Sequence, residues 1–277
     1  MPLSIGLQLY TLRNEMEKDF KGTLEKVKEM GYEGVELAGL FGKKGKEIKK
    51  MLDELSLKAV SAHVPLDELL EEPDKTFQTY KDIGLEYIAI PHLPEEDRPQ
   101  AGNFDTTLKN ITFICEKAKE YGITMLYHNH NFEFDIVDGE YYLDTIYKSI
   151  SKDLLQTQID TCWVNVAGVN PSEYLMKYQD RAPIVHLKDF VMKNRARKEN
   201  LYEFLGTNSS VEIDEDVKED FAFRPVGYGV QDFKSILDAC KKVNTKWVIV
   251  EQDRPAKGQT ELESAKLSCE FIKNLGL

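Results

Sequence analysis

Four residues that can bind a divalent metal stand at the ends of four apolar segments of the sequence. Glu133, Asp160, His186 and Glu251 each lie at or just beyond such a segment. Three carboxylates and one imidazole suit a hard or borderline cation such as Mn²⁺, Mg²⁺, Co²⁺ or Zn²⁺. Such a metal stabilises the enediolate that forms when a proton leaves the carbon beside a carbonyl. The set predicts a metal-dependent enzyme with one divalent cation as its cofactor.

The outcome of that chemistry depends on which groups move the proton. Two carboxylates on opposite faces of a substrate can remove and return a proton, which inverts a carbon centre, and Glu133 and Glu251 are the predicted pair. If a hydroxyl or glycosyl group lies β to the carbonyl, the same enediolate expels it. His128 or His130 could then protonate the leaving oxygen, since strand alternation turns both imidazoles to the same side. The predicted catalytic residues are Glu133, Glu251, His128 and His130.

Six further residues stand near these positions and could contact a substrate. Lys188 and Asp189 follow His186, where a lysine could hold a keto oxygen and a carboxylate could orient a metal-bound imidazole. Structural alternatives stay open, such as a solvated lysine at the rim or a hydrogen-bonded histidine at position 63. The predicted substrate contacts are His63, Asn129, Trp163, Lys188, Asp189 and Arg224.

These residues need a scaffold that brings distant segments to one rim. Eight short apolar runs alternate with amphipathic helical segments, and glycines such as Gly31 and Gly84 follow the helical segments. The runs are residues 4–10, 33–37, 58–63, 87–92, 123–128, 155–160, 183–188 and 247–252. This alternation predicts a closed (β/α)₈ TIM barrel, whose active site lies at the C-terminal ends of the strands. A doubly wound open sheet is the alternative, but no GxGxxG motif follows the first run.

The chain is predicted to be a single domain, residues 1–277, with one insertion. The interval from His186 to Glu251 is more than twice that from Asp160 to His186. The extra residues, 190–229, are too polar to form a core, and long loops inside compact domains are commonly functional. We expect either a solvated loop, or a lid over the barrel mouth, or a contact between the subunits of a homo-oligomer.

Composition narrows the classes of partner. The net charge of −12 and the pI near 5.0 disfavour a surface that neutralises nucleic acid. No segment approaches the roughly 20 apolar residues that span a bilayer, and the start lacks a signal-like pattern, so a cytoplasmic protein without a membrane partner is expected. The four cysteines are widely separated and are expected to be free thiols: Cys115, Cys162, Cys240 and Cys269.

Several motifs together resemble one known family. They are GLQLYTLR, YHNHNFEF, QIDTCWV, HLKD, PVGYG and IVEQD. Through them the sequence resembles the xylose-isomerase-like TIM barrels, also called the sugar phosphate isomerase/epimerase superfamily, over nearly its whole length. The resemblance implies a small carbohydrate substrate and one divalent metal, held by Glu, Asp, His and Glu from the fifth to the eighth strand. Carried onto this chain, those ligands are Glu133, Asp160, His186 and Glu251.

The fifth-strand ligand departs from the family pattern. A comparison without gaps puts Tyr127 or His128 where the family has its strand Glu, and Glu133 where a substrate-contacting Glu is found. Either the backbone turns so that Glu133 reaches the metal, or His128 or His130 replaces it, or the metal site is weaker. We assign Glu133 and keep the histidines as alternatives.

The sequence and the resemblance together predict a metal-dependent sugar isomerase or epimerase that acts through an enediolate on a ketose or keto-sugar. The alternative is a lyase, dehydratase or hydratase that acts on 3-keto-glycosides or inosose-like substrates by the same chemistry. Two other classes stay open. An AP-endonuclease-like nuclease would need several metals and a basic groove, and a barrel that binds sugar without catalysis would need no metal.

Overall fold

The structure is a computed structural model and describes residues 3–194 and 220–276. Parallel strands close into a barrel in the order β1-β12-β9-β8-β5-β4-β3-β2. They are β1 (Ser4–Gln8), β2 (Gly34–Ala38), β3 (Lys58–His63), β4 (Tyr87–Ile90), β5 (Thr124–His128), β8 (Leu155–Asp160), β9 (Ile184–Leu187) and β12 (Trp247–Val250). The predicted (β/α)₈ TIM barrel is confirmed, and each predicted apolar run overlaps one strand, with β2 beginning and ending one residue later than its run.

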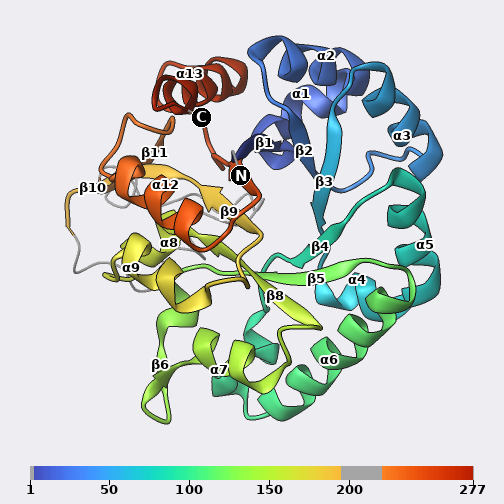
Figure 1. The fold of residues 1–277 in the computed structure, drawn as a ribbon, viewed down its shortest axis with the longest axis vertical. Helices are drawn as coiled ribbons and strands as arrows, with labels where there is room; N and C mark the ends of the chain where they lie inside the picture. Colours follow the sequence, from blue (N-terminus) through green and yellow to red (C-terminus); the bar gives the residue numbers. More distant parts are fainter. Residues whose placement is uncertain (1–2, 195–219, 277) are drawn as a thin grey trace.

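Helices form a ring outside the strands (Figure 1). They are α1 (Arg13–Lys18), α2 (Phe20–Met30), α3 (Gly45–Glu54), α4 (Leu66–Glu71), α5 (Pro73–Ile83), α6 (Phe104–Glu120), α7 (Tyr142–Ser149), α8 (Thr161–Val166), α9 (Pro171–Leu175), α12 (Phe233–Lys242) and α13 (Glu261–Asn274). Single 3₁₀ turns are η1 (Leu9–Leu12), η2 (Glu95–Asp97), η3 (Pro99–Ala101), η4 (Phe132–Phe134) and η5 (Met176–Tyr178). Gly31 and Gly84 end α2 and α5 with φ of 93° and 91°, a left-handed conformation that glycine adopts without strain.

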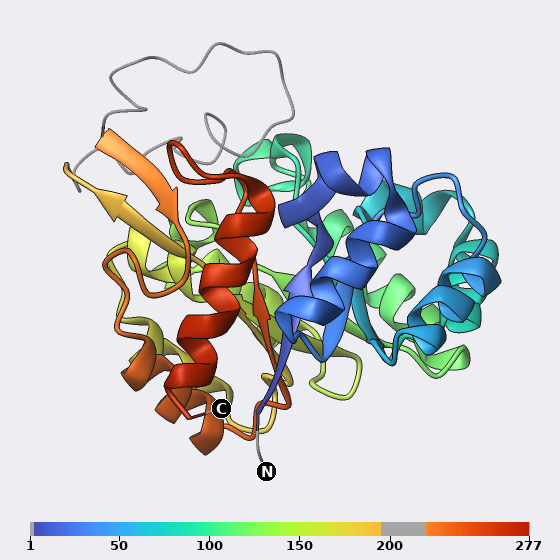
Figure 2. The ribbon, with the colours of Figure 1, turned by 90° about the horizontal axis from the view of Figure 1, so that it is seen from above.

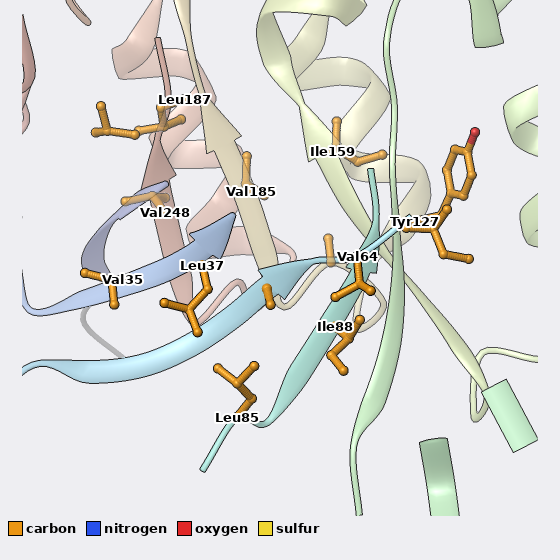
Figure 3. Close-up of a cluster of buried hydrophobic side chains, with 14 of the residues drawn as sticks. Val35, Leu37, Val64, Leu85, Ile88, Tyr127, Ile159, Val185, Leu187 and Val248 are labelled. Atoms are coloured by element: carbon orange, nitrogen blue, oxygen red, sulfur yellow. The ribbon is translucent and has the colours of Figure 1, made fainter. Parts of the chain in front are cut away.

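Side chains alternate along each strand between two environments. Val185 and Leu187 of β9 lie in the main core between the barrel and its helices (Figure 3). Ile184 and His186, the other members of the same strand, face the barrel interior because the side-chain period of a strand is two. Ile184 packs there with Ile249 of β12 in a separate apolar cluster. The interior above this cluster is polar, and the candidate site occupies it.

The register of the strands aligns the predicted ligands. Asp160 on β8 is the direct partner of His186 on β9. His128 at the end of β5 is in turn the partner of Gln158 on β8. Because the strands are parallel, these residues lie at one end of the barrel, where the C-terminal ends of the strands meet.

Within residues 3–194 and 220–276, two antiparallel hairpins stand apart from the barrel. One joins β6 (Ile136–Val137) to β7 (Glu140–Tyr141), and the other joins β10 (Asp189–Met192) to β11 (Phe221–Arg224). The second hairpin contains both limbs of the predicted insertion 190–229 and projects at the end of the barrel opposite the chain termini (Figure 2). Residues 195–219 of that insertion lie outside the described residues.

Two expectations drawn from composition can be compared with the structure. Across residues 3–194 and 220–276, no helix combines the length and the apolar character that crossing a membrane requires. The four cysteines are buried free thiols, as predicted.

Candidate metal and active site

Four metal-capable side chains meet where the strands end. His128 ends β5, Asp160 ends β8, His186 lies within β9, and Glu251 directly follows β12. Each offers one ligand atom, and these atoms all lie within 4.8 Å of one another. All four residues are buried. Two imidazoles and two carboxylates at this spacing are a donor set that a divalent transition metal accepts.

Glu133 lies apart from this group. It is in the 3₁₀ turn η4, where its carboxylate accepts hydrogen bonds from the Tyr127 hydroxyl at 2.9 Å and from the His130 backbone N–H at 2.7 Å. Both carboxylate oxygens are engaged by these two donors, and burial raises the pKa of Glu133 to about 8. Among the described residues, His128 and not Glu133 lies with Asp160, His186 and Glu251.

Asp160 has one oxygen committed to the fold and one that faces the cluster. Its Oδ1 accepts from the backbone N–H groups of Cys162 at 2.8 Å and Trp163 at 3.1 Å, which makes Asp160 the N-cap of α8. Its Oδ2 is buried and accepts no hydrogen bond from the part of the chain that the structure describes. Oδ2 lies 3.5 Å from the Lys188 Nζ and 3.8 Å from the His128 Nε2. A buried acceptor aimed at other ligand-type atoms fits a bound cation.

His186 lies between two carboxylates. Its Nδ1 is 3.0 Å from the Glu251 Oε2, and its Nε2 is 2.7 Å from the Glu36 Oε1. Burial opposes the charged form, but Glu36 and Glu251 together raise the pKa of His186 to about 10. Because Glu251 belongs to the metal-capable group and Glu36 lies inside the barrel, the His186 Nδ1 faces that group and its Nε2 faces the barrel interior.

Glu36 is not among the site residues predicted from the sequence, although the sequence contains a signal for it. Glu36 is a lone carboxylate in the apolar strand GVELA of β2, between Val35 and Leu37. Because those neighbours face the main core, alternation turns Glu36 into the barrel, where it is fully buried. A buried carboxylate inside a barrel must have partners, so its position alone indicated a role at the site.

Lys188 brings a positive charge to the cluster. Its Nζ lies 3.0 Å from the Glu251 Oε2, 3.5 Å from the Asp160 Oδ2 and 3.1 Å from the Asp253 Oδ2. Burial alone would lower the pKa of Lys188, but Asp253, Glu251 and Asp160 together hold it well above its ordinary value. Asp253 is likewise not among the site residues predicted from the sequence, although it lies two residues beyond Glu251 in the motif IVEQD. Alternation would have placed both on one side.

A cavity of about 420 Å³ opens above these residues. Glu251, Lys188, Asp253 and four histidines are among the polar residues that line it: His63, His92, His128 and His130. An apolar wall faces them, made of Ala38, Gly39, Pro65 and Pro91. This volume suits a small molecule.

The remaining predicted substrate contacts divide into two groups. His63 and Lys188 line the cavity. Asn129 instead accepts from the Asp160 backbone N–H at 3.0 Å and so ties β5 to β8, while Arg224 donates to the Phe223 carbonyl on β11. Trp163 is buried beside His130, with ring centroids 5.4 Å apart. Neither Asn129, Arg224 nor Trp163 is among the described residues that line the cavity.

Asp189 also serves the fold. Its carboxylate accepts backbone N–H groups from the segment that leads from β11 to α12, at 3.0 Å from Gly227, 2.7 Å from Gly229 and 3.0 Å from Val230. It does not contact His186, whose two ring nitrogens face Glu36 and Glu251. Asp189 therefore anchors the PVGYG segment, and it is not among the described residues that line the cavity.

Comparisons with known proteins agree with this fold. An inosose dehydratase of Lacticaseibacillus casei is 23% identical over 265 residues, which cover 87% of this chain and 85% of that protein. A sugar phosphate isomerase/epimerase from Parabacteroides distasonis has a similar fold, with a TM-score of 0.77 at 20% identity over 99% of this chain and 94% of its own. The IolI protein with a bound zinc atom gives 0.73 at 16% identity, over 99% and 98% of the two chains.

The family description "Xylose isomerase-like TIM barrel" matches residues 24–275, which include every strand of the barrel except β1. The match contains His128, Asp160, His186 and Glu251, the four side chains whose ligand atoms meet. This chain belongs to the xylose isomerase-like TIM barrel family.

Proposed function

We propose that this protein is a divalent-metal-dependent lyase that eliminates water, or another β leaving group, from a cyclic keto-polyol through an enediolate. The observation that carries the proposal is the buried group His128, Asp160, His186 and Glu251 at the base of a small-molecule cavity. The similarity to inosose dehydratases supports elimination over the isomerisation that the sequence analysis placed first.

The residues present fit a metal. We assign the ligand atoms to His128, Asp160, His186 and Glu251, because the Asp160 Oδ2 and the His186 Nδ1 both face this group. When bound, the cation supplies Lewis-acid stabilisation of the negative charge that develops on the carbonyl oxygen. The choice among divalent ions depends on their availability as much as on these ligands.

Two cavity residues have the properties that the proton transfer requires. Burial holds the pKa of His130 well below its ordinary value, so its imidazole is neutral and can accept the proton from the carbon beside the carbonyl. The same imidazolium can then give that proton to the leaving oxygen, so that the C–O bond breaks, a C=C bond forms and water departs. The Lys188 ammonium lines the same cavity beside Glu251, where it would stabilise negative charge that develops on a substrate oxygen.

The position of Glu133 favours elimination over inversion. A two-base epimerase needs acids on opposite faces of the substrate. Glu133, the predicted partner of Glu251, binds Tyr127 and the His130 backbone and is not among the described residues that line the cavity. Imidazoles stand in the cavity instead, and one imidazole can serve both steps of an elimination.

The charge of the cavity favours neutral substrates. Glu68, Glu251 and Asp253 line it, and Lys188 is the one lysine or arginine among its described lining residues. Lys188 is already paired with three carboxylates. A phosphate group would meet uncompensated negative charge here, so we infer that non-phosphorylated keto-inositols and keto-glycosides bind better than sugar phosphates or nucleic acid.

Deuterium exchange with product analysis tests this function. Protein loaded with Mn²⁺ is incubated in D₂O with a keto-inositol and with a 3-keto-glucoside. We expect deuterium beside the carbonyl and a product lighter by one water or one alcohol, both lost in Asp160→Asn and His130→Asn but retained in Lys193→Ala. Exchange with conversion to an epimer and no loss of water would support the isomerase instead. No exchange with any keto-sugar would overturn both enzyme assignments.

A further inference from the structure

The barrel interior holds one carboxylate that the proposed chemistry does not use. Glu36 on β2 is fully buried beneath the metal-capable group. It is not among the described residues that line the cavity. A buried charge is costly unless it is fully hydrogen-bonded, so its surroundings indicate what it does.

Five side chains converge on the two oxygens of Glu36. Its Oε1 lies 2.7 Å from the Gln8 Nε2, 2.7 Å from the His186 Nε2 and 3.1 Å from the His63 Nε2. Its Oε2 accepts from the Ser61 hydroxyl and, at 2.6 Å, from the Gln158 Nε2. The partners come from β1, β3, β8 and β9, so the closure of the whole barrel sets the orientation of this carboxylate.

We propose that Glu36 is a positioning residue that holds His186 with its Nδ1 directed at the metal. The proposal rests on the metal-dependent function proposed above. A carboxylate that accepts the N–H of one ring nitrogen fixes the imidazole tautomer and leaves the lone pair on the other nitrogen. Nε2 faces Glu36, and Nδ1 faces Glu251 on the side where the ligand atoms meet, so a bound metal would take the Nδ1 lone pair in place of the proton that Nδ1 shares with Glu251 in the metal-free site.

The other partners of Glu36 make this orientation rigid. Ser61, Gln158 and Gln8 are each fully buried and donate to it, so the carboxylate cannot rotate without leaving donors unpaired. The Gln158 Oε1 also lies 3.2 Å from the His128 Nδ1. Gln158 therefore connects Glu36 to His128, the other imidazole of the metal-capable group. Glu36 therefore holds one proposed ligand directly and a second through Gln158.

The test compares Glu36→Gln with wild type and with Glu133→Gln. Both substituted positions are fully buried carboxylates with hydrogen-bonded oxygens, but only Glu36 contacts the metal-capable group. Calorimetric titration with Mn²⁺ is expected to show an affinity about 10-fold to 100-fold weaker in Glu36→Gln and unchanged in Glu133→Gln. The visible absorption of the Co²⁺-loaded protein, which reports ligand geometry, should change in Glu36→Gln alone.

The outcomes separate this role from the function on which it rests. If wild type binds Mn²⁺ and Glu36→Gln shows the same affinity and the same Co²⁺ spectrum, the role of Glu36 is overturned and the metal-dependent function stands. If wild type binds no divalent metal, both are overturned.

A measurement on the wild type keeps the inference testable if Glu36→Gln does not fold. The chain has five histidines, so ¹⁵N NMR of the histidine-labelled, Zn²⁺-loaded protein can assign the protonated nitrogen of each ring. We expect His186 to carry its proton on Nε2 and to bind Zn²⁺ through Nδ1. Binding of Zn²⁺ through Nε2 of His186 would overturn the proposal.

Discussion

At the scale of single residues, three carboxylates surround one buried ammonium group, that of Lys188. Lys188 is 1% exposed and lies within 3.5 Å of oxygens from Asp160, Glu251 and Asp253. Removing one partner from such a group leaves the remaining charges buried without compensation, which is costly. We therefore expect Lys188 to contribute both to the stability of the metal-free site and to charge stabilisation during the proposed reaction.

We predict that Lys188→Met lowers kcat by about 100-fold or more, because it removes a preorganised donor at the oxyanion. In the metal-free protein it should also reduce the free energy of unfolding by about 3–5 kcal/mol, since three carboxylates then face one another. Added Mn²⁺ should restore part of that loss. Steady-state kinetics and urea unfolding with and without Mn²⁺ measure these effects, with the exposed Lys193→Ala as control. Wild-type kcat in Lys188→Met would contradict the assigned role.

The raised pKa of Glu133 predicts how the free energy of unfolding depends on pH. Its pKa is raised by burial from an ordinary 4.5 to about 8, so the folded state keeps a proton that the unfolded state releases. The associated stability is fully present below the unfolded pKa and is lost as pH rises toward 8, at about 1.4 kcal/mol per pH unit for one proton. Urea unfolding between pH 5 and 8 should show this slope in wild type and a shallower one in Glu133→Gln. Equal slopes in the two proteins would show that Glu133 is ionised throughout.

At the scale of elements, the positions of the strands can be predicted from local sequence, but the structure of the loops after them cannot. Each predicted apolar run overlaps a strand because buried parallel strands are continuous apolar segments with a recognisable length. The β10–β11 hairpin was read only as a polar insertion, because its pairing joins residues 189–192 to 221–224 across a long gap. The segment that follows β11 is anchored by one carboxylate, Asp189, whose partners are backbone N–H groups that sequence patterns do not show.

We predict that Asp189→Ala loosens this hairpin before it affects the barrel. Several N–H groups lose a charged acceptor, so the free energy of unfolding should fall by about 2–3 kcal/mol. Hydrogen exchange should rise in residues 220–231 and stay unchanged in β5 and β8. Asp189→Asn keeps one acceptor oxygen and should show a smaller increase in exchange. Uniform exchange across the chain in Asp189→Ala would argue against a local anchor.

For the whole molecule, the barrel brings together strands from opposite ends of the chain, and the proposed metal should stabilise that closure. A ligand that binds only the folded state adds about 2.7 kcal/mol at one hundred times its Kd. We predict that EDTA treatment lowers the Tm and that Mn²⁺ restores it in a concentration-dependent manner. Asp160→Asn should abolish the Mn²⁺ response. A Tm in wild type that is insensitive to both EDTA and Mn²⁺ would contradict the metal site.

The sequence by itself determined the barrel and the placement of Asp160, His186 and Glu251 at the ends of its strands. Apolar periodicity and strand ends are local properties that can be read without coordinates. Only the tertiary structure decided that Glu133 binds Tyr127 and lies apart from the ligand group. Only closure of the barrel brings Glu36 to His186 across 150 residues of chain. Such contacts depend on strand register and on turns after the strands, which residue types alone do not specify.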